Sequence, residues 1–147
     1  MARLVEATSA AQIAAVRELF AEYARLVDEP CCFVDFQSEL ASLPGPYKLF
    51  LFEEDAGCVG VRFLDSKTAE MKRLYVRSAH RGKGLGRALA EAAIEVARKA
   101  GCNRIVLDTL PKMQEAQGLY RTLCFKEIPP YLKDPTPGAI CFELRFS

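Results

Sequence analysis

A glycine-rich loop is the part of the sequence whose residue types most clearly suggest chemistry. Residues 81–86 read Arg-Gly-Lys-Gly-Leu-Gly and stand between an apolar run, 71–76, and an alanine-rich segment, 85–100, with helical periodicity. Alternate glycines let the backbone turn sharply and bring its N–H groups close to a ligand, and the start of a helix favours negative charge. The pattern therefore predicts an anion site, and a diphosphate group is its natural occupant.

Two other glycine-loop motifs fit this sequence less well. A dinucleotide-binding fold requires Gly-x-Gly-x-x-Gly, or the same motif ending in Ala, and the sixth position counted from Gly82 is Arg87. A nucleotide P-loop places Ser or Thr directly after Gly-Lys, and here Gly84 follows Lys83. A turn that only connects a strand to a helix is the third alternative, and the neighbouring segments argue against it.

The composition limits the classes of protein that need to be considered. The chain has 147 residues, half of them hydrophobic, and we expect a single domain over 1–147. A net charge of +1, from 20 basic and 19 acidic residues, argues against a nucleic-acid partner. The N-terminus lacks the apolar core of a signal peptide and no run has membrane-spanning length, so we expect a cytoplasmic protein without a membrane partner.

The cysteines predict neither a disulfide framework nor a metal site. The six cysteines include no Cys-x-x-Cys spacing, and four of them lie in or beside apolar segments. His80 is the single histidine, which leaves no plausible set of zinc ligands. We therefore expect reduced thiols, mostly buried, and no bound metal.

Hydrophobic periodicity predicts the elements that must position the loop. Apolar residues at three- and four-residue steps predict helices, and short runs of β-formers bounded by turn residues predict strands. A strand before the loop, the helix after it and the next strand form one crossover of the parallel kind. The predicted helices span 9–27, 36–43, 85–100 and about 112–123, and the predicted strands span 3–6, 47–53, 58–64, 69–76, 104–109, 125–131 and 139–146.

Two segments together resemble the cofactor motif of the GNAT superfamily of N-acetyltransferases. The run Met-Lys-Arg-Leu-Tyr-Val at 71–76 precedes the motif Gln/Arg-x-x-Gly-x-Gly/Ala, which is filled here by Arg81, Gly84 and Gly86. The helical companion of this motif is similar to 116–125, which contains Ala-x-x-Leu-Tyr and Leu-Cys-Phe. In element order the resemblance covers essentially the whole chain.

The resemblance implies a fold, an activity and a cofactor. The fold is α+β, with a mixed, mostly antiparallel central sheet of six to seven strands, flanking helices and one parallel strand-helix-strand crossover. The activity is transfer of an acetyl group from acetyl-CoA, as co-substrate, to a primary amine on a small molecule or peptide, by direct attack in a ternary complex. Many such proteins form homodimers. The alternative is a CoA-binding regulatory or interaction module that does not turn over.

The resemblance also assigns roles to individual residues. Glu70 corresponds to a glutamate that deprotonates the amine in several family members, although it could equally be an ordinary strand carboxylate paired with a neighbouring cation. Tyr120 corresponds to the acid that serves the departing thiolate. The implied cofactor-binding residues are Leu74, Tyr75, Val76, Arg81, Gly82, Lys83, Gly84, Leu85, Gly86 and Arg87.

The sequence departs from the family pattern at two positions. Met113 occupies a position at which relatives often carry Asn, so one side-chain hydrogen bond is expected to be missing. The usual Leu-Gly-Phe is replaced at 123–125 by Leu-Cys-Phe, which is expected to alter the turn that ends the helix. Neither change removes a group that acetyl transfer requires.

Overall fold

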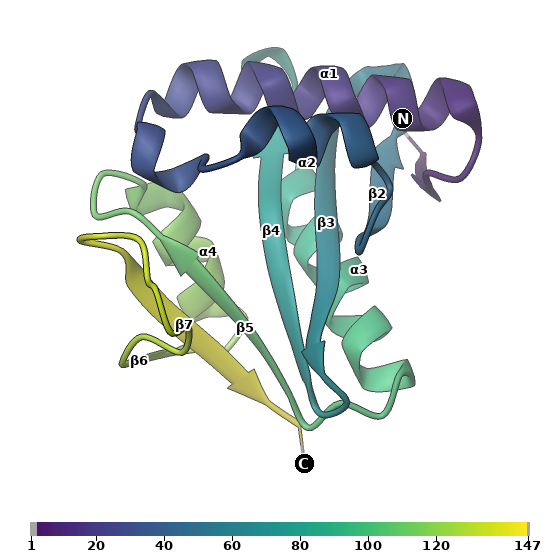
Figure 1. The fold of residues 1–147 in the computed structure, drawn as a ribbon. Coiled ribbons are helices and arrows are strands. Elements are labelled where there is room, and N and C mark those ends of the chain that lie inside the picture. The colour runs from purple at the N-terminus through teal and green to yellow at the C-terminus, as the bar shows by residue number, and fades with distance from the viewer. Residues whose placement is uncertain (1–2, 147) are drawn as a thin grey trace.

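A seven-stranded sheet organises the computed structural model, which describes residues 3–146 (Figure 1). The strand order is β1-β2-β3-β4-β5-β7-β6. All neighbours are antiparallel except β4 and β5, which are parallel and joined through α3. The strands are β1 (Leu4–Glu6), β2 (Lys48–Phe52), β3 (Gly57–Asp65), β4 (Thr68–Val76), β5 (Arg104–Thr109), β6 (Lys126–Ile128) and β7 (Ile140–Arg145). The predicted mixed, mostly antiparallel sheet with one parallel crossover is confirmed.

Helices cover both faces of this sheet. The helices α1 (Ala10–Val27) and α2 (Phe36–Ser42) lie on one face, and α3 (Leu85–Lys99) and α4 (Gln114–Thr122) lie on the other (Figure 1). Each face has its own core cluster of apolar side chains, one packed beneath α1 and the larger one beneath α3. The predicted domain includes residues 1, 2 and 147, which lie outside the described residues.

The sequence accounts locally for the two long helices. Ser9 caps α1 and forms a capping box with Gln12, in which each side chain bonds the other residue's backbone N–H. The helix α3 is bounded by glycines, because Gly84 and Gly101 adopt φ values of 78° and 85° that other residues rarely reach. Burial of the alanine-rich face of α3 then aligns its N-terminus with the end of β4.

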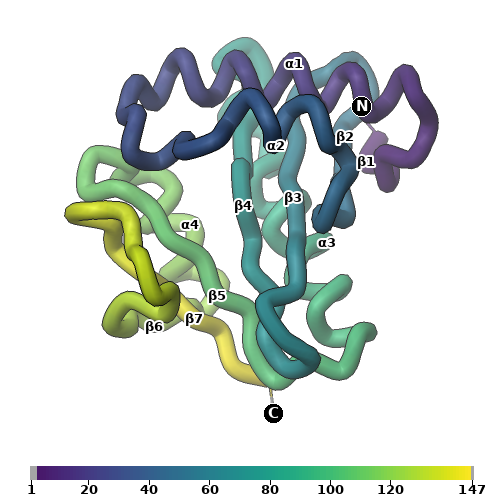
Figure 2. Tube along the Cα trace, viewed as in Figure 1, coloured from purple at the N-terminus to yellow at the C-terminus, as the bar shows by residue number. Residues whose placement is uncertain are grey.

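The strands β4 and β5 separate partway along their length, and this separation creates the site. Their parallel pairing covers Thr68–Arg104, Ala69–Ile105 and Glu70–Val106, and no β4–β5 pairing within the described residues continues beyond it. The backbone of Arg73, farther along β4, has a φ of 59°, which marks a local irregularity in the strand. Figures 1 and 2 show β4 and β5 close together at one end of the sheet and far apart at the other, like the arms of a V.

Two predicted elements are shorter in the structure. The strand predicted at 125–131 is limited to β6, since Pro129 and Pro130 have no N–H to donate to a neighbouring strand. The helix predicted to follow Pro111 begins only at Gln114, after a turn closed by a hydrogen bond from Met113 N to Leu110 O. No helix within residues 3–146 is long and apolar enough to cross a membrane.

Candidate active site

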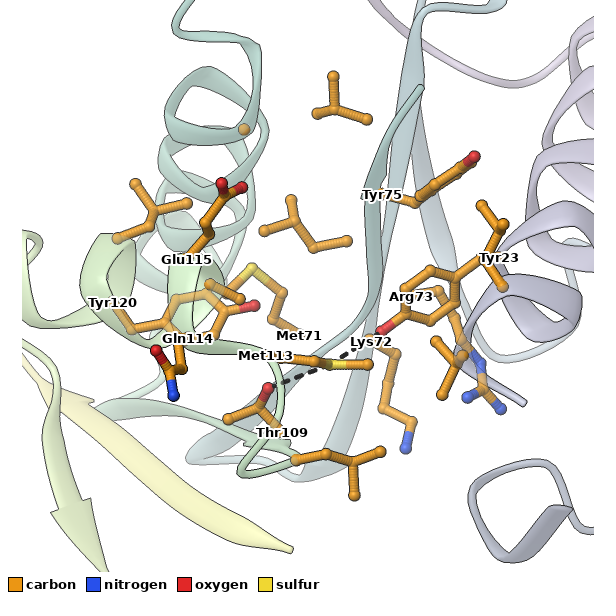
Figure 3. Close-up of a pocket in the computed structure, with 18 of the residues that line it drawn as sticks. Tyr23, Met71, Lys72, Arg73, Tyr75, Thr109, Met113, Gln114, Glu115 and Tyr120 are labelled. Carbon is orange, nitrogen blue, oxygen red and sulfur yellow. Dashed lines mark hydrogen bonds between the residues drawn. The ribbon is translucent and has the colours of Figure 1, made fainter. Parts of the chain in front are cut away.

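The gap between β4 and β5 opens into a cavity of about 520 Å³. One wall is the second half of β4, and the opposite wall is formed by the end of β5 and by α4 (Figure 3). The glycine loop closes one end of this cavity, and the C-terminal part of α1 with the segment after it borders the other. Elements from both halves of the sequence therefore meet at one site.

The glycine loop has the backbone conformation that an anion cradle requires. Gly82 and Gly84 have φ values of 79° and 78°, and at either residue no atom beyond its two chain neighbours lies within 4 Å of where a Cβ would stand. No side chain caps the N-terminus of α3, and its first intrahelical bond runs from Ala88 N to Gly84 O. The N–H groups of the first helical turn are thus free of intrahelical acceptors and face the open loop. This donor set fits a phosphate-bearing ligand.

Arg81 stabilises the loop and also supplies positive charge. Its Nε donates to Val76 O at 3.0 Å, which ties the loop to the end of β4. The side chain is otherwise exposed and lines the cavity. His80, at the end of the short turn Ser78–His80, is half-buried and also lines the cavity.

The irregularity at Arg73 is held in place from the other face of the sheet. Its guanidinium donates to both carboxylate oxygens of Glu39, at 2.9 and 3.1 Å, and to Cys32 O at 3.1 Å. The same group lies 4.4 Å from the centroid of the Phe33 ring. Arg73 therefore fastens the α1–α2 segment over the cavity, and its donors are already engaged.

Tyr120 presents an unengaged hydroxyl to the cavity. Its ring is buried between Phe125 and Phe142, with centroid distances of 5.8 and 6.0 Å. The hydroxyl points into the cavity (Figure 3), and no hydrogen bond joins it to another described residue. Burial raises the pKa of Tyr120 above its ordinary value of 10.0, so the phenol stays protonated and can donate to a ligand.

Glu70, unlike Tyr120, does not line the cavity, and it is completely buried. Arg62 Nε donates to its Oε1 at 2.5 Å, and the Tyr131 hydroxyl donates to its Oε2. Both oxygens therefore have partners already. The predicted role of this carboxylate as a base is not tested by this arrangement and stays a prediction.

Most of the predicted cofactor-binding residues gather at the cavity. Lys83 and Arg87 do not line it, because both are exposed and the Arg87 guanidinium lies 3.8 Å from Glu91 on the outer face of α3. The predicted residues that do line the cavity are Leu74, Tyr75, Val76, Arg81, Gly82, Gly84, Leu85, Gly86 and Tyr120.

Met113 lines the cavity and connects the end of β5 with α1. The Thr109 hydroxyl is 3.4 Å from its sulfur and the Tyr23 hydroxyl is 3.9 Å from it (Figure 3). The residue that was expected to lose a hydrogen bond therefore accepts two weak ones. The predicted site residues do not include Tyr23, Phe33 or Cys32, which line the cavity. The one available signal was a hydroxyl-bearing Tyr23 on the apolar face of a helix.

Comparison with known proteins identifies the class to which this fold and site belong. The model of the acetyltransferase (GNAT) family matches residues 13–125. This range includes the irregular strand β4, the glycine loop and Tyr120. The chain belongs to the GNAT acetyltransferase family.

Two of the relatives found are themselves described as uncharacterised N-acetyltransferases. An uncharacterised N-acetyltransferase of Schizosaccharomyces pombe is 40% identical over 92 residues, which make up 62% of this chain and 56% of that protein. The uncharacterised N-acetyltransferase YjgM of Escherichia coli is 33% identical over 137 residues, with 87% and 82% of the two chains covered. The chain thus spans little more than half the length of the yeast relative.

A solved structure shows the same fold with a cofactor present. YncA of Salmonella typhimurium, described as an acetyltransferase with its cofactor acetyl-CoA, superposes with a TM-score of 0.74. The match covers 98% of this chain and 93% of that one, at 21% sequence identity. Within residues 3–146 no group of three or more His, Cys, Asp or Glu side chains could hold a metal ion.

Proposed function

We propose that this protein transfers an acetyl group from acetyl-CoA to a primary amine in a ternary complex. The observation that carries the proposal is the cavity at the separation of β4 and β5, which combines a phosphate cradle at one end with the free Tyr120 hydroxyl in its wall. Membership of the acetyltransferase family supports the same activity. A binding module would need the cradle but would have no use for the hydroxyl.

The residues present fit acetyl-CoA, which would supply the acetyl thioester. The open backbone of the glycine loop and the first turn of α3 would hold its diphosphate, with Arg81 balancing negative charge. The side of β4 at 74–75 that has no strand partner among the described residues would bind the rest of the cofactor through backbone N–H and C=O groups. The same fixed N–H groups suit the negative charge that develops on the thioester oxygen during attack.

In the proposed transfer a C–N bond forms to the acetyl carbon and the C–S bond breaks. The neutral amine loses one proton and the departing sulfur gains one, so the products are an N-acetyl compound and a free thiol. Tyr120 has an ordinary pKa of 10.0, against about 8.5 for a thiol, and burial raises it further. Full proton transfer from Tyr120 is therefore uphill, and its contribution is a hydrogen bond to the thiolate.

The amine must also lose the extra proton of its ammonium form. A lysine-like amine with a pKa of about 10.4 is only about 0.04% neutral at pH 7, so a base increases the rate. Glu70 remains our proposed base. For this role one of its oxygens must exchange a present partner, Arg62 or Tyr131, for water from the cavity.

Release of free thiol from acetyl-CoA, followed over a panel of primary amines, tests the proposal. We expect Tyr120→Phe to lower kcat about 10- to 1,000-fold while leaving the affinity for acetyl-CoA unchanged, because only the leaving thiolate uses the hydroxyl. Tyr47→Phe, at a buried tyrosine of the opposite core cluster, is the matched control and should keep wild-type turnover. Tight acetyl-CoA binding without amine-dependent thiol release would instead favour the regulatory module.

A further inference from the structure

Lys72 and Asp108 face one another across the cavity, one from each diverging strand. Lys72 Nζ lies 3.9 Å from Asp108 Oδ1, at the outer limit of an ion pair. The side chains are 16% and 18% exposed, and both line the cavity. No hydrogen bond within residues 3–146 joins either charged group to another side chain or to the backbone, so both keep donors and acceptors available to a ligand.

The other cations on this side of the cavity are already engaged. The donors of Arg73 are taken by Glu39 and by Cys32 O. Lys112 Nζ donates to Val27 O at 2.6 Å and to Glu29 at 3.2 Å, which fixes the end of α1. Lys72 is thus the cation on this wall that can turn to a ligand without breaking a short contact.

The surface beside this pair is apolar and formed by the end of α1 and the segment after it. Tyr23, Leu26, Val27 and Phe33 line the cavity here, and Leu26 is 63% exposed. An exposed leucine at the mouth of a cavity can pack against an apolar group that enters it. Asp108 lines the same cavity as Tyr23 and Tyr120.

We propose that Lys72 and Asp108 form a clamp for an α-amino acid with an apolar side chain. Asp108 binds the ammonium group, Lys72 binds the carboxylate, and the side chain packs against the apolar wall. An α-amino acid carries its ammonium and carboxylate groups close together, and Lys72 and Asp108 also lie close together. On binding, the weak contact between Lys72 and Asp108 is replaced by charge-assisted hydrogen bonds to the ligand. This inference rests on the proposed function and names the class of its acceptor.

Comparison of an amino acid with the amine that lacks its carboxylate tests the clamp. We would measure thiol release from acetyl-CoA with L-phenylalanine and with 2-phenylethylamine. Wild-type protein should prefer L-phenylalanine in kcat/KM by about 10-fold or more, the value of one charge-assisted hydrogen bond. Lys72→Met should abolish this preference by raising KM for L-phenylalanine only. Asp108→Asn should lower kcat/KM for both substrates.

Lys99→Met, on the exposed surface of α3, is the matched control and should keep the wild-type preference. Equal turnover of the two substrates, or a preference that survives Lys72→Met, would overturn the clamp and leave the acetyltransferase proposal standing. A calorimetric titration of L-phenylalanine into CoA-saturated protein separates the two proposals further. Binding heat that is present in the wild-type protein and absent in Lys72→Met would support the clamp even without turnover. No binding heat in the wild-type protein would overturn the clamp.

Discussion

The Tyr131 hydroxyl donates a hydrogen bond to the completely buried carboxylate of Glu70. This contact joins the segment that follows β6 to the first half of β4, across 61 positions of the chain. Arg62 on β3 binds the other carboxylate oxygen at 2.5 Å. Three elements are therefore held together by one buried charge.

Removal of the tyrosine hydroxyl should weaken this junction. We expect Tyr131→Phe to lower the free energy of unfolding by about 1 to 3 kcal/mol, because a buried carboxylate loses a donor. Urea denaturation measures the change. Tyr47→Phe, whose hydroxyl takes no part in the junction, should stay within about 0.5 kcal/mol of wild type.

Glu70→Gln separates the two roles of this carboxylate. If Glu70 is the base, the Gln variant should lose about 100- to 10,000-fold in kcat, while Tyr131→Phe keeps most of its activity. Steady-state rates of thiol release in the two variants decide between the catalytic and the structural role of Glu70. Equal, small losses in the two variants would contradict the base role and leave Glu70 as a structural junction.

The left-handed backbone conformation of Gly84 is predicted to serve binding as well as folding. Gly84→Ala and Gly101→Ala form a matched pair, because both residues have φ near 80° with no atom within 4 Å of the added Cβ. Each change should cost about 1 kcal/mol of stability. Only Gly84→Ala should weaken acetyl-CoA binding, as measured by calorimetry, and equal affinities in the two variants would argue against the cradle.

Cys124 stands in a left-handed conformation that suits glycine better. Its φ is 72°, and the chain turns there so that Phe125 N can donate to Tyr120 O at 3.0 Å. We expect Cys124→Gly to stabilise the protein by about 0.5 to 1 kcal/mol in thermal or urea unfolding. Cys124→Ala keeps the strain and should bring no gain, so a similar gain in both variants would contradict this explanation.

Glu22 should make stability depend on pH in the acid range. The Tyr75 hydroxyl donates to its carboxylate, with Arg77 close by, and the pKa of Glu22 is thereby lowered below its ordinary value of 4.5. The charged form is favoured in the folded state, so its contribution is complete above that ordinary value and is lost as the pH falls through the lower, folded pKa.

The free energies of unfolding of wild type and Glu22→Gln should therefore differ most near pH 7 and converge toward acid pH. Urea denaturation at a series of pH values measures the difference. Glu18→Gln, at an exposed position of the same helix, is the control and should give a smaller difference. A difference between wild type and Glu22→Gln that persists unchanged below the folded pKa would contradict the assignment.

Much of the fold could be predicted because its signals are local. The capping box at Ser9, the period of α3 and the glycines at its two ends define helices from neighbouring residues alone. The glycine loop carries its own conformational signature for the same reason. The strand predicted at 125–131 is longer than β6, because the prolines that follow β6 have no N–H groups to donate to a neighbouring strand.

The acceptor side could not be predicted because its contacts are distant in the sequence. Arg73 meets Glu39 across 34 positions, and nothing in an arginine's own surroundings indicates a φ of 59°. Lys72 and Asp108 come together because each lies two residues beyond the paired Glu70 and Val106, on neighbouring strands that are 36 positions apart in the sequence. Such juxtapositions depend on sheet topology rather than on any motif.

Titration calorimetry of acetyl-CoA into the wild-type protein and into Arg81→Glu tests the central claim most directly. The account predicts micromolar binding to the wild type and loss of that binding in the variant, because the change reverses a charge beside the phosphate cradle and breaks the bond to Val76 O. Thermal unfolding of the variant verifies that it is folded. Absence of binding heat in the folded wild-type protein would contradict the acetyltransferase proposal and reduce the glycine loop to a structural turn.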